Sequence, residues 1–93
     1  MKSVNPKSND FFLKGFELFE QKRYEDALRA FKASVRARPD DADVRYGLGL
    51  MYLLTGDKNA AMNEYRILKS LNANLGKKLK GFISPARQFT LEV

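Results

Sequence analysis

A fixed spacing of 34 residues relates two successive stretches of the sequence. Gly15 and Gly49 are separated by this interval, and so are Ala27 and Ala61. Small residues of this kind are needed where two helices approach closely, with a large residue nearby to fill the remaining space. Large residues recur at the same interval in the pairs Leu18 and Tyr52, and Phe31 and Tyr65. A period of this length is typical of a helix–turn–helix repeat, so it restricts the chain to a stack of paired helices.

Apolar spacing within residues 8 to 75 also predicts helices. Phe12, Phe16 and Phe19 stand at intervals of four and three, which places them on one helical face. The spacing is interrupted at 21 to 24, at Pro39, at 55 to 57 and at 72 to 74. We therefore expect four helices of about 12 to 14 residues and a shorter fifth one that starts after Gly76. The predicted N-caps are Ser8, Asn9 and Asp10 for the first helix, Asp40 and Asp41 for the third, and Asp57 for the fourth.

Residues 8 to 41 and 42 to 75 share a motif. Its members are Phe11, Gly15, Leu18, Tyr24, Ala27, Phe31 and Pro39 in the first stretch, and Leu48, Gly49, Tyr52, Gly56, Asp57, Ala61 and Tyr65 in the second. On these residues the chain resembles the tetratricopeptide repeat family. The resemblance implies an all-α fold with two antiparallel helix–turn–helix repeats in a short right-handed solenoid. Only the glycine and the alanine are identical between the halves, so the match is one of pattern, and other paired-helix solenoids stay open.

Three positions depart from the family's pattern. Lys14 replaces a usual leucine, which suits a first repeat whose outer edge has no neighbour. Arg45 occupies a position that is usually bulky and apolar, and Ala73 replaces the closing proline. We expect Arg45 to lay its stem along the preceding helix and to keep its charge in solvent.

The remaining segments frame the repeats. We expect a flexible N-terminal segment at 1 to 7, a capping helix at 76 to 84 and a C-terminal tail at 85 to 93. Continuing the repeat count predicts that the apolar residues of the capping helix pack onto the previous helix pair and that its lysines point outward. The apolar residues are Leu79, Phe82 and Ile83, and the lysines are Lys77, Lys78 and Lys80. An array of this kind needs such a cap, because its last pair would otherwise expose an apolar face.

The composition argues against catalysis. The chain has no cysteine and no histidine, which removes disulfides, thiolate chemistry and the commonest general base and metal ligand. Asp40, Asp41 and Asp43 cluster, but acidic residues at a helix start are explained by capping and the helix dipole. We therefore expect no enzyme activity, no cofactor, no metal and no small-molecule substrate.

The net charge of +6, from 17 basic and 11 acidic residues, raises the question of nucleic acid. The excess lies at the two ends of the chain rather than in the repeats, and no aromatic–basic interleaving accompanies it, so nucleic-acid binding is not expected. A basic rim of Lys77, Lys78, Lys80 and Arg87 could instead steer an acidic partner. No secretory signal or membrane-spanning run is visible, so a cytoplasmic protein is expected.

Surplus apolar surface points to an interaction site. In the resembled family the first helix of each repeat lines a concave groove that takes peptides. The corresponding positions here are Asn9, Phe12, Phe16 and Phe19 in the first repeat, and Asp43, Tyr46, Leu50 and Leu53 in the second. With Lys77 and Lys80 of the rim, these are the predicted partner-binding residues, although they could simply enlarge the core. A subgroup of the family grips carboxylates with lysine and asparagine, but the matching positions here are Phe12, Phe16 and Gly47, so that clamp is missing.

The sequence thus predicts a protein–protein interaction module, an adaptor that binds a peptide or protein segment by apolar contact. The alternative is a self-assembling scaffold whose groove is filled by its own or a neighbouring chain's tail, which carries Phe89, Leu91 and Val93. Because two repeats fall below the number usually needed for independent stability, a homo-oligomer is also expected.

Overall fold

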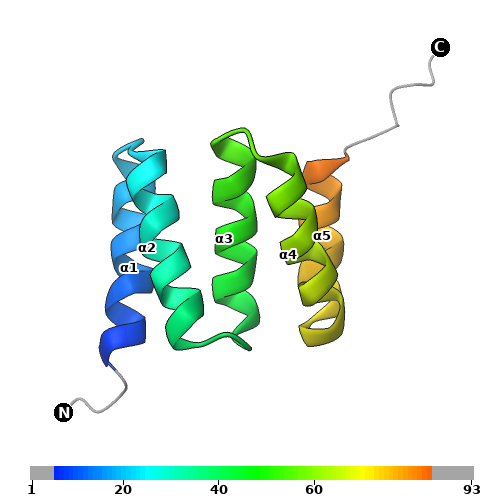
Figure 1. Ribbon diagram of the computed structural model, residues 1–93, viewed down its shortest axis with the longest axis horizontal. Coiled ribbons are helices and arrows are strands. Elements are labelled where there is room, and N and C mark those ends of the chain that lie inside the picture. The colour runs from blue at the N-terminus through cyan, green and yellow to red at the C-terminus, as the bar shows by residue number, and fades with distance from the viewer. Residues whose placement is uncertain (1–5, 85–93) are drawn as a thin grey trace.

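A computed structural model describes the backbone of residues 6–84 and the side chains of residues 11–84. The described chain is all-α. Its five helices follow one another in the order α1 (Pro6–Glu20), α2 (Tyr24–Ala37), α3 (Ala42–Leu54), α4 (Lys58–Leu71) and α5 (Ala73–Ile83). Consecutive helices run in opposite directions, and each packs against the next (Figure 1). This arrangement confirms the predicted all-α stack of paired helices.

Two of the predicted N-caps are confirmed. The Asp41 carboxylate accepts hydrogen bonds from the backbone N–H groups of Asp43 (3.0 Å) and Val44 (3.3 Å). The Asp57 carboxylate accepts one from the N–H of Ala60 at 3.0 Å. These bonds satisfy N–H groups that have no partner within the helix.

Two helix boundaries differ from the prediction. α1 already includes residues 8 to 10 and reaches back to Pro6, the first described residue, so the predicted cap residues lie within the helix. α5 begins at Ala73 rather than after Gly76. Asn72 ends α4 by donating its N–H to the Leu68 carbonyl at 2.7 Å, and it also starts α5 by accepting from the Leu75 N–H at 3.1 Å. One residue therefore replaces the predicted three-residue break.

Glycines set the closest approaches between helices. The fully buried ring of Phe31 on α2 lies between Gly15 of α1 and Gly47 of α3. A Cβ atom would lie 2.9 Å from this ring at Gly15 and 2.8 Å from it at Gly47, which is too close for any side chain. In the same way, a Cβ at Gly49 would lie 2.6 Å from a Leu79 methyl. The 34-residue glycine spacing therefore does mark close packing, although Gly47 lies outside that spacing.

Two apolar clusters form the core of the described chain. The first joins Leu18, Ala27, Phe31, Leu48 and Met51, and the second joins Ala61, Leu68, Leu79 and Ile83. Leu50 and Tyr52 of α3 pack against both clusters. The core is therefore continuous through α3.

α5 covers the end of the stack with one face only. Leu79 and Ile83 are buried as predicted, but Phe82 is 60% exposed, so the prediction that it packs back onto the previous pair is wrong. Leu79 and Ile83 lie one turn apart on the same face, whereas Phe82 projects to the side of it. Lys77 and Lys78 are exposed, while Lys80 is half-buried with its ammonium 5.1 Å from the centre of the Tyr65 ring.

Arg45 does not keep its charge in solvent, contrary to the prediction. Its Nη1 donates to Glu64 Oε1 of α4 at 3.0 Å, and its Nε donates to the Pro39 carbonyl at 2.8 Å. Only 15% of the Arg45 side chain and 9% of the Glu64 side chain are exposed. The guanidinium therefore replaces apolar packing at this position with a buried ion pair that ties α3 to α4.

Candidate interaction groove

A groove of about 540 Å³ opens between α1, α3 and α5. These three helices point the same way in Figure 1, with the reversed helices α2 and α4 between them in the chain. Aromatic and aliphatic residues form most of the lining, which consists of Phe16, Phe19, Tyr24, Phe31, Asp43, Tyr46, Gly47, Leu50, Met51, Leu53, Leu54 and Phe82. Phe31, Gly47 and Met51 are buried and form its base.

The rim of the groove is exposed apolar surface. Phe16 is 44% exposed on the α1 side, Leu54 is 48% exposed at the end of α3, and Phe82 is 60% exposed on α5. Concave apolar surface of this kind, contributed by separate helices, is a common feature of binding sites for apolar segments.

Aromatic contacts hold the α1 wall in place. Phe16 meets Phe12 edge-on with ring centroids 5.0 Å apart, and it meets Phe31 at 5.3 Å with the rings perpendicular. Phe12 also meets Phe31 at 5.8 Å. This triangle fixes the direction of the Phe16 ring before any ligand arrives, which lowers the entropy cost of binding.

The structure brings six of the predicted partner-binding residues together. Phe16, Phe19, Asp43, Tyr46, Leu50 and Leu53 all line the groove. Phe12 does not line it, because its half-buried ring packs beneath Phe16 against the first core cluster. The side chain of Asn9 lies outside the described residues. Lys77 and Lys80 stand on α5 away from the lining, and their contact with a partner stays a prediction.

The sequence analysis does not predict the two most exposed apolar residues of the groove, Leu54 and Phe82. It expects Phe82 to pack onto the previous helix pair, and Leu54 falls one residue beyond the predicted groove position at Leu53. In both cases the amino-acid type gave no signal, because phenylalanine and leucine are equally suited to core and rim. Whether Leu54 and Phe82 pack in the core or stand at the rim depends on how α3 and α5 are rotated about their own axes.

Asp43 carries the single formal charge in the lining, which contains no lysine or arginine. Its side chain is exposed and forms no ion pair or hydrogen bond with any described residue. The groove is therefore apolar with one unpaired carboxylate at the α3 N-terminal end.

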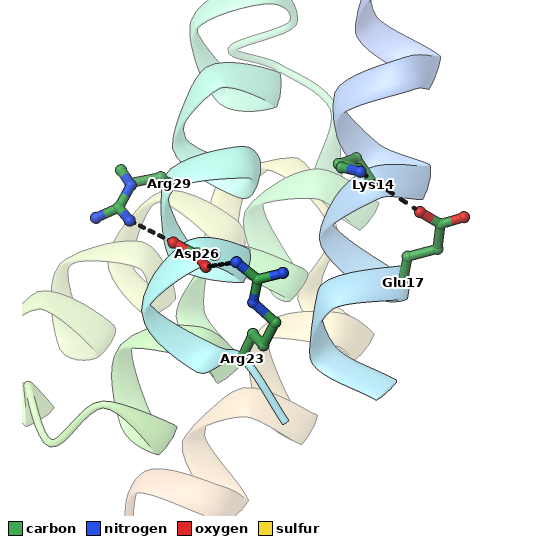
Figure 2. Close-up of polar contacts among 5 residues, drawn as sticks. All are labelled: Lys14, Glu17, Arg23, Asp26 and Arg29. Atoms are coloured by element: carbon green, nitrogen blue, oxygen red, sulfur yellow. Dashed lines mark hydrogen bonds and ion pairs between the residues drawn. The ribbon is translucent and has the colours of Figure 1, made fainter. Parts of the chain in front are cut away.

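Most ion pairs of the described chain lie on outer surfaces instead. Figure 2 shows Asp26 of α2 between Arg23, the residue just before that helix, at 2.6 Å, and Arg29 of α2. The hydrogen bond from Arg23 lowers the pKa of the Asp26 carboxyl. Figure 2 also shows Lys14 beside Glu17 at 3.9 Å on α1. None of these side chains lines the groove. The charged residues of Figure 2 therefore do not compensate the Asp43 carboxylate.

The outer face of α1 carries a second, shallower hollow. It is lined by Phe11, Leu13, Lys14 and Glu17, and Leu13 is 61% exposed. Lys14 is solvated here, as expected for an edge helix without a neighbour. Within the described chain, α1 makes its main contacts with α2.

Two further kinds of feature are absent from the described part of the chain. Among residues with described side chains, no group of three or more histidine, cysteine, aspartate or glutamate residues could hold a metal ion. No helix of the described part is long and apolar enough to cross a membrane.

A sequence model of the family described as Tetratricopeptide repeat matches residues 12–73. The match covers most of α1 and all of α2, α3 and α4. No curated protein matches the chain.

Proposed function

The chain belongs to the tetratricopeptide repeat family, and from that premise we propose that it is a protein–protein interaction module that binds an apolar segment of a peptide or protein in its concave groove. The observation that supports this most is the groove itself. Side chains from α1, α3 and α5 leave Phe16, Leu54 and Phe82 exposed around one cavity.

Apolar contact would supply most of the affinity. The groove has an aromatic wall on α1 and an aliphatic one along α3, and its base is closed by Phe31 and Gly47. Because a Cβ at Gly47 would collide with Phe31, no larger residue fits at this position. The carboxylate clamp of the subgroup named above is thus sterically excluded at one of its three positions.

The test is capture of partners by full-length protein and by two groove variants, Phe16→Glu and Phe82→Glu, which place a charge on opposite walls. Ile67→Glu is the matched control, because Ile67 is 37% exposed on α4 and does not line the groove. We expect a partner that the wild type and Ile67→Glu retain and that both groove variants lose. A partner that survives both groove variants would contradict the proposal. Circular dichroism checks that each variant remains helical.

A second candidate function is self-assembly, with the tail of a neighbouring copy in the groove. It is favoured by the position of Phe82, which lines the groove only two residues before the last described residue, Ser84. The following segment, 85 to 93, lies outside the described residues, and its sequence contains Phe89, Leu91 and Val93. Alternating apolar residues suit an extended segment that presents one apolar side.

Sedimentation over a concentration series separates the two candidates. Self-assembly predicts that the wild type forms dimers or larger species, and that Phe16→Glu and the tail double variant Phe89→Ser/Leu91→Ser are both monomeric. A wild type that stays monomeric up to about millimolar concentration would exclude assembly through the tail of a neighbouring copy.

A further inference from the structure

We propose that the groove selects segments in which a lysine or arginine stands beside apolar side chains, and that Asp43 and the ring of Tyr46 together hold the cation. The proposal rests on the groove being a binding site for a segment of another protein. It specifies the chemistry of that partner: an apolar, positively charged segment rather than an acidic one.

The first argument is the placement of the two side chains. Asp43 and Tyr46 both line the groove and stand three residues apart on α3. Residues at this spacing are neighbours on a helix surface, with their Cβ atoms about 5–6 Å apart. One cation can therefore lie against the carboxylate and the aromatic face at the same time.

The second argument is charge complementarity. Asp43 is the single charged residue of the lining and has no partner within the described chain. It lies in the first turn of α3, where the helix dipole favours a negative charge. A ligand that covers the groove removes water from this carboxylate, and a cation on the ligand restores both its hydrogen bonds and its charge compensation. A carboxylate on the ligand would add repulsion at the same place.

The third argument comes from the four tyrosines of the chain. Lys32 stands 5.7 Å from the centre of the Tyr52 ring, and Lys69 and Lys80 stand 5.6 and 5.1 Å from that of Tyr65. These are ordinary cation–π distances. Tyr24 and Tyr46, the two tyrosines that line the groove, have no such cation among the described side chains. The two half-buried groove tyrosines thus have no cation of the described chain against their rings.

The net basic charge of the chain does not oppose this arrangement at short range. The lysines of α5 are outside the lining, and Arg23 and Arg29 in Figure 2 pair with Asp26. Because solvent-exposed charges are screened over about 8 Å at physiological ionic strength, the uncompensated Asp43 determines the preference inside the groove.

The experiment is a selection of random displayed peptides of about 16 residues, long enough as a helix to span α3, on the full-length protein. Peptides that also bind the Phe82→Glu variant are removed, so that only groove ligands remain. We expect the enriched peptides to share a lysine or arginine next to two or more large apolar residues. The same selection on Asp43→Lys is expected to enrich aspartate or glutamate at that place, while Asp40→Lys, a matched change outside the groove, keeps the original preference.

A measurement with one enriched peptide completes the test. Fluorescence anisotropy should show that Asp43→Asn weakens its binding about fivefold or more, that Tyr46→Leu also weakens it, and that Asp40→Asn and Tyr46→Phe leave it nearly unchanged. Equal losses for Asp43→Asn and Asp40→Asn would overturn the proposal, because they would reflect net charge alone. Groove ligands without a common cation would also overturn it while leaving the interaction function intact. If no peptide depends on Phe82, the interaction function itself fails.

Discussion

At the scale of single residues, the least expected contact is the buried pair of Arg45 and Glu64. From the sequence alone Arg45 is expected at the surface, because its partner Glu64 lies on the next helix, 19 residues away. In the fold, the guanidinium bonds both to Glu64 and to the Pro39 carbonyl. Such a pair need not stabilise the protein more than apolar residues would, but each member depends on the other.

We therefore predict that Glu64→Leu lowers the free energy of unfolding by about 2–4 kcal/mol, since it leaves the Arg45 charge buried without its partner. The double variant Arg45→Met/Glu64→Leu should recover most of this loss. Urea denaturation of the wild type, the double variant and the single variants Glu64→Leu and Arg45→Met measures both effects. If the double variant were as unstable as the sum of its single changes, the pair would not be coupled.

A second prediction at this scale concerns the close approach of Gly47 to Phe31. Gly47→Ala should destabilise the protein by about 1–3 kcal/mol, because the new methyl would press on the Phe31 ring, which Gly15 confines from the other side. Gly81→Ala is the matched control, since a Cβ there meets no other atom within 4 Å. Alanine favours helix over glycine, so this control should be stabilised by about 0.5–1 kcal/mol. Thermal unfolding of both variants tests the contrast, and equal behaviour would contradict the close packing at Gly47.

At the scale of elements, the number and type of helices could be predicted from the sequence, because glycine and alanine spacing, Asp41 and Asp57 all act locally. The start of α5 could not, since Asn72 serves two helices at once and the composition of 72 to 74 suggests a longer break. Six groove residues were predicted by their repeat position. The places of Phe12, which was predicted to line the groove but packs against the core, and of Phe82, which lines the groove unpredicted, could not be read from the sequence. The side of a helix that becomes buried depends on how its neighbours dock.

The two faces of α5 give a direct prediction. Leu79→Ala should cost about 2–5 kcal/mol of stability, because Leu79 is fully buried against Gly49 and the second core cluster. Phe82→Ala should change stability by less than about 1 kcal/mol, since its ring is largely in solvent, yet it should weaken ligand binding. Chemical denaturation together with a binding assay separates the two roles. A large stability loss for Phe82→Ala would mean that its ring belongs to the core.

At the scale of the whole molecule, stability is shared through neighbouring contacts. α3 packs against α2, α4 and α5, whereas α1 depends mainly on α2. In stacked repeats each unit is stabilised by the units beside it, so α3 is the most supported helix and α1 the least.

Amide hydrogen exchange should reflect this gradient. We predict that the amides of α3 exchange most slowly, close to the rate set by global unfolding, and that those of α1 exchange fastest among the helices. Exchange monitored by NMR or mass spectrometry under native conditions measures the order. Protection in α1 equal to that in α3 would contradict this order. It would indicate that the exposed outer face of α1 around Leu13 is covered in solution, for example by a second copy.

The position of Phe31 limits how the groove can change. The same ring closes the core between Gly15 and Gly47 and forms the base of the groove, so a substitution that reshapes the base also alters stability. Phe16, Asp43, Leu54 and Phe82 are exposed at the rim, and most changes there leave folding intact. A related sequence could therefore acquire a different partner by altering only its rim, while the helix stack beneath it stays the same.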